Sequence, residues 1–292
     1  MIGRTGARAL LSLVTLGACG PGTRAQEGGT PPDARPATGP PAASKPTPTP
    51  ACSDEPGMVY IAGGDYKFWQ DREKRPIAAF WIDRTEVSVQ AFRAFVAAGH
   101  SPPYQSNTKA RPLVCTWELA DNDQLPINCI DWYQAEAFCL WSKKRLPTAQ
   151  EWSWAAQGRD ELRKYPWGSE LPNCDLTITD QNRDDDVTGC GRNRPWPVGS
   201  RPRDATRDGV LDMMGNVTEW TSTGATAEER SSRCLMGSTW STQTSERLDV
   251  SANGGYVGRE GYSDKTGLRC VKEVGPQPPC TAAATPGAPD QP

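Results

Sequence analysis

The chain has 292 residues, of which 27 are proline and 28 glycine, and its net charge is −3 with a single histidine. This weak negative charge gives no sign of the basic face that a nucleic-acid partner would need. One histidine, His100, excludes zinc or iron sites built from several histidines and argues against a Ser-His-Asp triad. Eleven tryptophans against five phenylalanines favour a loop-rich core, because each indole combines a large apolar surface with one N–H donor.

The N-terminus has the pattern of a signal peptide. Two arginines precede a short apolar run at residues 9–18, which is too short to cross a membrane as a mature helix. Cys19 follows small residues, which resembles bacterial lipoprotein signals, so we expect residues 1–18 to be removed and Cys19 to carry a lipid. The alternative is a plain secretory signal cut nearer Ala25.

Both interpretations place the protein outside the cytoplasm, where disulfides form. We expect a lipid-anchored protein of the bacterial cell envelope, and Gly20 favours the outer membrane by resemblance to other lipoproteins. Residues 19–51 are rich in Pro, Ala, Thr and Gly and predict a tether without a core, at about 3 Å per residue when extended. Residues 281–292 form a similar tail, which leaves one domain over residues 52–280.

The first half of this domain carries clear strand and helix signals. Residues 58–64 form a β-rich run that ends in a Gly-Gly turn, and residues 80–83 are a second strand candidate. Ser88 is placed to cap a helix with apolar residues on one face, and Gly99 is placed to end it.

Two more helices are predicted from capping boxes, in which the first and fourth residues bond each other's backbone N–H. Asp131 with Gln134 begins a helix over residues 132–143, and Thr148 with Glu151 begins another. Beyond these helices the periodicity fades, and short strands, many turns and few helices are expected.

Ten cysteines suggest a disulfide framework. If Cys19 carries a lipid, nine remain, so at least one is unpaired or bonded elsewhere. No pair has the C-x-x-C spacing of zinc ribbons or thioredoxin-like sites. Three pairings are hypotheses that can each contribute a few kcal/mol: Cys115–Cys129, Cys174–Cys190 and Cys52–Cys280.

The segment 209–221 places Asp212 and Glu219 among apolar residues, with a Gly-Asn turn between them. It is too short and irregular for a helix, and it predicts a buried, sharply turned loop whose polar groups need partners. The two carboxylates could point at one hard cation, with backbone carbonyls completing an oxygen shell of the kind that calcium takes. The alternative is that both acids are turn caps or surface groups.

Six motifs together point to a family. They are residues 80–87 (FWIDRTEV), 126–132 (PINCIDW), 144–152 (KRLPTAQEW), 165–168 (YPWG), 214–220 (MGNVTEW) and 267–270 (GLRC). In this order, over about residues 57–272, the chain resembles the formylglycine-generating enzymes, or sulfatase-modifying factor domains. The resemblance implies a single α+β domain of the C-type-lectin-like fold, low in regular secondary structure and flanked by Pro-rich ends. For the true enzymes it also implies a copper-dependent oxidase that converts a sulfatase cysteine to formylglycine.

The resemblance also implies structural calcium. By the family's pattern, the side chains of Asp212 and Glu219 and the carbonyls of Gly215 and Val217 would hold one ion. A second family site would use Asn173 and a later acid, for which Asp186 is a candidate, and the Cys174–Cys190 disulfide could replace that ion. The null alternative for the acidic run 184–186 is a solvated loop. A family disulfide between the second helix and the last strand fits Cys139 and Cys270.

The catalytic positions depart from the family. Ser241 and Glu246 stand where the true enzymes have the two cysteines that hold Cu(I), a soft ion that prefers sulfur. Ser238 is kept, and Lys265 replaces the family's Asn. These replacements argue against copper and against oxidase activity.

Two classes of function follow. The first is a non-catalytic, calcium-stabilised, lipid-anchored module whose ligand could be a protein, a peptide or a glycan. The second is an enzyme: a formylglycine-generating oxidase that uses Cys234, or another activity in the same cleft. The cleft candidates are Ser238, Ser241, Glu246 and Arg259.

Overall fold

The computed structural model describes residues 54–67, 74–106, 113–180, 187–224, 231–243, 249–250, 253–276 and 279–280. The predicted signal peptide, the tether and the tail from residue 281 lie outside these residues, as do Cys19, Cys52, Asp186 and Glu246. Among the helices of the described segments, none is long and apolar enough to cross a membrane.

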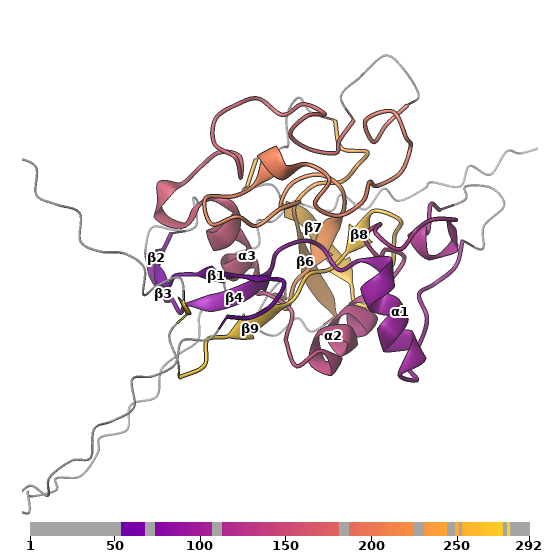
Figure 1. Cartoon of the computed structure of the whole chain (residues 1–292), viewed down its shortest axis with the longest axis horizontal. Helices are drawn as coiled ribbons and strands as arrows, with labels where there is room; N and C mark the ends of the chain where they lie inside the picture. Colours follow the sequence, from indigo (N-terminus) through magenta and orange to yellow (C-terminus); the bar gives the residue numbers. More distant parts are fainter. Residues whose placement is uncertain are drawn as a thin grey trace, which may run out of the picture.

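Strand β4 (Phe80–Asp83) is the centre of a three-stranded sheet. It pairs antiparallel with β1 (Met58–Ile61) on one side and with β9 (Val271–Glu273) on the other. Three of its four residues are buried, as expected for a strand with neighbours on both edges. The predicted strand at residues 80–83 is confirmed, and the sheet joins the two ends of the described domain (Figure 1).

The β-rich run predicted at residues 58–64 is present as β1, which ends at Ile61, and the two glycines follow it. After β1 the chain turns, and β2 (Gly64–Tyr66) pairs antiparallel with β3 (Arg75–Ile77) in a separate two-stranded sheet. Gly63 lies at this turn, where an added Cβ would stand 2.5 Å from the Ile77 carbonyl oxygen, so a larger residue would clash with the backbone. The break between β1 and β2 therefore has a steric cause at Gly63, which the pattern of hydrophobic residues does not predict.

All three predicted α-helices are present. Helix α1 (Val89–Ala97) begins at Ser88, whose side chain accepts a bond from the Ala91 N–H. Helices α2 (Trp132–Trp141) and α3 (Ala149–Ala156) both have complete capping boxes. Helix α2 ends two residues before the predicted boundary, because Lys143 takes a left-handed conformation with φ 58°.

The second half of the chain forms a four-stranded sheet between long loops. Its order is β7 (Asn253–Gly258), β6 (Ser232–Met236), β5 (Thr218–Trp220) and β8 (Thr266–Gly267), with β5 and β8 parallel and the other pairs antiparallel. Figure 1 shows the segment between α3 and β5, pink to orange, as a long loop on one side of the sheets. Short 3₁₀ turns lie at η1 (Thr116–Glu118), η2 (Arg159–Glu161) and η3 (Pro202–Asp204).

The core has two main parts. One surrounds Trp152 of α3 and the inner side chains of β1 and β4. The other joins α1 to α2, where the rings of Phe92 and Phe138 stack at 5.5 Å, and continues to Trp220 of β5. Strand β5 is fully buried between these parts, so every polar group on it must find a partner inside the protein.

Candidate functional site

The centre of the domain is a buried ion pair between Glu219 of β5 and Arg269, which follows β8. The Arg269 Nε–Glu219 Oε2 distance is 2.7 Å and the Nη2–Oε1 distance is 2.8 Å, and both side chains are at most 1% exposed. Trp152 donates its indole N–H to Glu219 Oε2 at 2.7 Å. The guanidinium also donates to three backbone carbonyls, those of Asp83, Leu211 and Asp212.

These contacts bear on the calcium predicted for the segment 209–221. Both oxygens of Glu219 already accept bonds from Arg269 or Trp152, which leaves fewer lone pairs for a cation, and calcium ligation by Glu219 stays a prediction. Asp212 Oδ2 accepts a bond from the Gly199 N–H at 2.6 Å. Within the described segments, no group of three or more His, Cys, Asp or Glu side chains is arranged to hold a metal. Calcium ligation by Asp212, Gly215 and Val217 stays a prediction as well.

The ion pair sits inside a cluster of buried acids. Glu86 accepts bonds from the Asn216 side-chain amide at 2.6 Å and from the Val217 N–H at 3.0 Å. Asp204 Oδ2 accepts a bond from the Asp212 N–H at 3.1 Å, while its Oδ1 is buried without a hydrogen-bond partner. We call Glu86, Asp204, Asp212 and Glu219 the acid cluster.

Burial shifts the titration of this cluster. It raises the pKa of Glu86 well above the usual value, and the charges of Asp212 and Glu219 add to that effect. Burial and the charge of Asp212 raise the pKa of Asp204 in the same direction. Burial also raises the pKa of Asp212, to about 6. One guanidinium cannot neutralise four buried carboxylates, so the environment favours the protonated forms of Glu86, Asp204 and Asp212 more than water does.

The sequence did not predict this centre, although Glu86 and Arg269 both lie in motifs that it contains. Their motifs are far apart in the sequence, and neither motif indicates that Arg269 contacts the buried acids. The signal that could have found it is the arginine itself, because a lone cation in an apolar segment such as 267–270 requires an acidic partner when it is buried.

The second predicted calcium site is only partly described. Asn173 Oδ1 accepts a bond from the Asp175 N–H at 2.9 Å, which is a local turn rather than a free ligand. Asp186 lies outside the described residues. The Cys174–Cys190 disulfide closes this loop, with an S–S distance of 2.01 Å.

Three predicted disulfides are confirmed: Cys115–Cys129, Cys139–Cys270 and Cys174–Cys190. Cys234 and Cys280 are also disulfide-bonded. The predicted partner of Cys280, Cys52, lies outside the described residues, so that pairing stays a prediction. Because Cys234 is bonded as well, this pairing and a lipid on Cys19 exclude each other within one chain. Cys234 is fully buried, and the expectation of an unpaired cysteine finds no support among the described residues.

The described part of the stretch that matches the family's catalytic segment, residues 236–243, contains no cysteine, and four of its side chains carry hydroxyl groups. Ser238 is buried and its Oγ accepts a bond from the Gly215 N–H at 2.8 Å, so it fixes the Gly-Asn turn. Ser241 Oγ lies 3.2 Å from Thr239 Oγ1. Arg259 is not in this stretch, and its guanidinium lies over the rings of Trp132 and Tyr133 at the start of α2. Neither serine has a histidine or carboxylate hydrogen-bonded to it in the described part of the chain.

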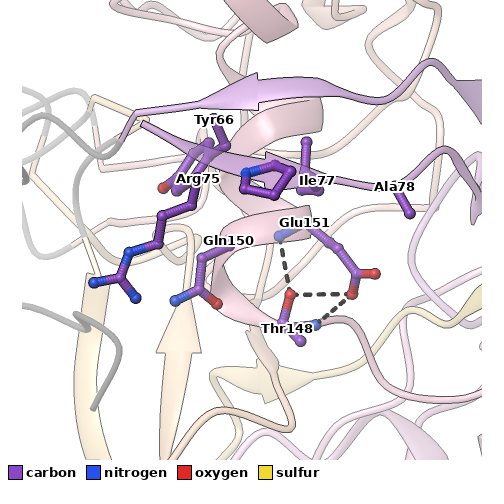
Figure 2. Close-up of a pocket in the computed structure, with 8 residues that line it drawn as sticks. Tyr66, Arg75, Ile77, Ala78, Thr148, Gln150 and Glu151 are labelled. Atoms are coloured by element: carbon purple, nitrogen blue, oxygen red, sulfur yellow. Dashed lines mark hydrogen bonds between the residues drawn. The ribbon is translucent and has the colours of Figure 1, made fainter. Parts of the chain in front are cut away.

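A pocket of about 370 Å³ lies elsewhere, between the β2–β3 sheet and the first turn of α3 (Figure 2). Its walls include Tyr66 of β2, Arg75 and Ile77 of β3, and Gln150 and Glu151 of α3. The sequence motifs do not indicate this pocket, because Arg75 belongs to none of the six.

Comparison with known proteins agrees with the motif order. Residues 44–274 match the model of the sulfatase-modifying factor enzyme 1-like domain. The mouse protein named inactive C-alpha-formylglycine-generating enzyme 2 is 27% identical over 272 residues, covering 76% of this chain and 88% of that protein. Hercynine oxygenase of Mycobacterium tuberculosis is 37% identical over 170 residues, covering 56% of this chain and 36% of that protein.

The fold is also found among solved structures. PvdO from Pseudomonas aeruginosa superposes with a TM-score of 0.59 at 17% identity, over 76% of this chain and all of that chain. Identity at this level supports the fold alone. The predicted single α+β domain of the C-type-lectin-like type is confirmed.

Proposed function

The chain belongs to the sulfatase-modifying factor family, and we propose that it is a non-catalytic member that serves as a binding or accessory module outside the cytoplasm. In this proposal Cys19 carries the lipid anchor and residues 20–51 hold the domain away from the membrane. The proposal does not require bound calcium, because Arg269 already holds the segment 209–221 through its ion pair with Glu219 and its bonds to the Leu211 and Asp212 carbonyls.

The observation that carries the proposal is the absence of free thiols where the family's copper chemistry needs them. Cu(I) is held by thiolates, and every cysteine in the described segments is in a disulfide. Ser241 occupies one of the two catalytic cysteine positions, and its hydroxyl is too hard a ligand for Cu(I). Cys234 is buried and oxidised, which argues against the alternative of an oxidase built on that residue.

The names of two relatives are compatible with a loss of the formylglycine-generating activity. The mouse relative is named an inactive formylglycine-generating enzyme, so a member of the family persists without the activity. Hercynine oxygenase indicates that the same domain can carry different chemistry, and formylglycine generation therefore does not follow from the fold. The ligand of this module, whether protein, peptide or glycan, has to be identified from its binding surfaces.

A copper competition experiment tests the proposal. The purified protein is titrated with Cu(I) in the presence of a chromogenic Cu(I) chelator, with its disulfides intact. We expect the chelator to keep the copper. The matched control is the double variant Ser241→Cys and Glu246→Cys, which restores two thiols at the family spacing and should withdraw copper. Tight copper binding by the wild-type protein would contradict the proposal.

A further inference from the structure

The pocket between the β2–β3 sheet and α3 has one unpaired positive charge. Arg75 contributes its guanidinium from β3, and it forms no ion pair with any residue that the structure describes. Gln150 contributes a side-chain amide from the first turn of α3. Figure 2 shows both side chains extending to the same side of the pocket. An arginine fork next to an amide is a donor set that suits a carboxylate.

Among the described residues that line the pocket, Glu151 is the only acid, and it is already neutralised. Glu151 forms two hydrogen bonds with Arg145, at 2.6 and 2.7 Å, and accepts the Thr148 N–H at 2.8 Å. Thr148 in turn accepts the Glu151 N–H, which completes the capping box. Arg145 also contacts Glu273, but that side chain is 68% exposed and its charge is screened by solvent. Among the described lining residues, Arg75 is therefore the one charged group without a counter-ion.

The remaining walls are apolar and rigid. The Tyr66 ring packs edge-on against Trp154 at 6.1 Å, and the Trp154 indole N–H donates to the Ala62 carbonyl at 2.8 Å. Pro76 and Ile77 of β3 also line the pocket. A wall held in this way needs little reorganisation when a ligand enters. The volume, about 370 Å³, is at the small end of the range for ligand pockets.

We propose that this pocket binds an organic carboxylate with a short apolar body, with Arg75 and Gln150 holding the carboxylate and Tyr66 and Ile77 contacting the body. The inference rests on the proposed function as a binding module, and it names the chemistry that the module recognises. Two sources supply such a group: the C-terminal residue of a protein, and a small free carboxylic acid.

The test is a calorimetric titration of the full-length protein with defined probes. 3-Phenylpropionate represents the free acid, and a short peptide that ends in Phe with a free carboxylate represents a chain end. Their matched controls are 3-phenylpropionamide and the same peptide amidated at its C-terminus. We expect at least one acid to bind and its amide to bind at least about tenfold more weakly, because hydrogen bonds to a charged group are worth more than neutral ones. Binding of the peptide acid identifies a chain end as the source, and binding of 3-phenylpropionate alone identifies a small acid.

Variants connect the binding to the pocket. Arg75→Gln should lower the affinity for the acid that binds by about tenfold to a hundredfold. Gln150→Glu should also lower this affinity, because the new carboxylate repels the ligand's carboxylate. Helix content measured by circular dichroism checks that both variants are folded. Arg84→Gln is the matched control, because Arg84 is exposed, outside the pocket and without a side-chain bond in the described part of the chain. Equal binding of acid and amide, unchanged affinity in folded Arg75→Gln, or no binding of either acid would overturn the inference. Copper binding by the wild-type protein would overturn only the proposed function.

Discussion

Glu219 and Arg269 form a bidentate ion pair in the fully buried centre of the domain, although 50 residues separate them in the sequence. The pair joins β5 to the segment that leads into β9, and thereby connects the two larger sheets. Trp152 adds a third donor from α3. The pair thus links parts of the chain that meet only in the folded state.

Removal of Arg269 should destabilise the protein strongly. Arg269→Met leaves Glu219 buried with an uncompensated charge, and we expect a loss of about 3–5 kcal/mol in the free energy of unfolding, measured by urea denaturation. The double variant Arg269→Met and Glu219→Leu should recover part of this loss. The exposed pair Arg203–Glu170 is the control, and Arg203→Met should change stability by less than about 1 kcal/mol. A value for Arg269→Met similar to this control would contradict the central role of the pair.

The acid cluster predicts a pH dependence with a definite sign. The pKa of Asp212 is raised to about 6, so the folded state binds more protons than the unfolded state at pH values between the usual carboxyl pKa and 6. The stability that Asp212 contributes is therefore fully present below pH 4, roughly, and is lost as the pH rises through 6. Glu86 and Asp204, whose pKa values are raised by burial, act in the same direction.

Asp204→Asn tests this dependence. The amide oxygen can still accept the Asp212 N–H, while the cost of a buried charge at that position is removed. We expect the variant to have a higher melting temperature than the wild type at pH 8 and a smaller difference at pH 5. A wild-type-like pH profile in the variant would exclude Asp204 from the proton-binding cluster.

The two disulfides Cys139–Cys270 and Cys174–Cys190 should differ in their contribution. The first closes a loop with a sequence separation of 131 and the second one of 16. In the chain-entropy model their removal costs about 5 and about 3 kcal/mol, respectively. Paired Cys→Ser variants measured by urea denaturation would show this order, and a larger loss for Cys174–Cys190 would indicate that native contacts, rather than loop closure, dominate.

Removal of calcium by a chelator tests whether Glu219 acts as the ion-pair partner of Arg269 or as a calcium ligand. Because both of its oxygens are occupied by Arg269 and Trp152, we expect the melting temperature to be the same in excess EDTA and in calcium. The sample must first be shown by elemental analysis to be free of bound ion. A rise in melting temperature with added calcium would instead support the ligand set predicted from the family.

The sequence predicts what depends on neighbouring residues. The capping boxes at Asp131 and Thr148 are complete in the structure because their partners lie three positions away. The disulfide Cys115–Cys129 is also predictable, because its two cysteines are only 14 residues apart. The acids of the segment 209–221 were correctly expected to be buried, but the partner of Glu219 comes from a distant motif.

The pocket also depends on contacts between distant residues, which the sequence does not predict. Arg75 and Gln150 belong to separate elements, and only the packing of the β2–β3 sheet on α3 brings them together. Gln150 lies in the motif 144–152, but Arg75 belongs to none of the six motifs, and nothing in the sequence pairs the two residues. The absence of cysteine at position 241, by contrast, is a fact of composition that needed no structure, and for this reason the strongest functional statement comes from the sequence.

The most direct test of the non-catalytic assignment is a product assay. The full-length protein is incubated with Cu(I), oxygen and a sulfatase-type cysteine peptide, beside an active formylglycine-generating enzyme, and the peptide is followed by mass spectrometry. We predict unchanged peptide with this protein and the aldehyde product with the active enzyme. Aldehyde formed by this protein above the copper-only background would contradict the account.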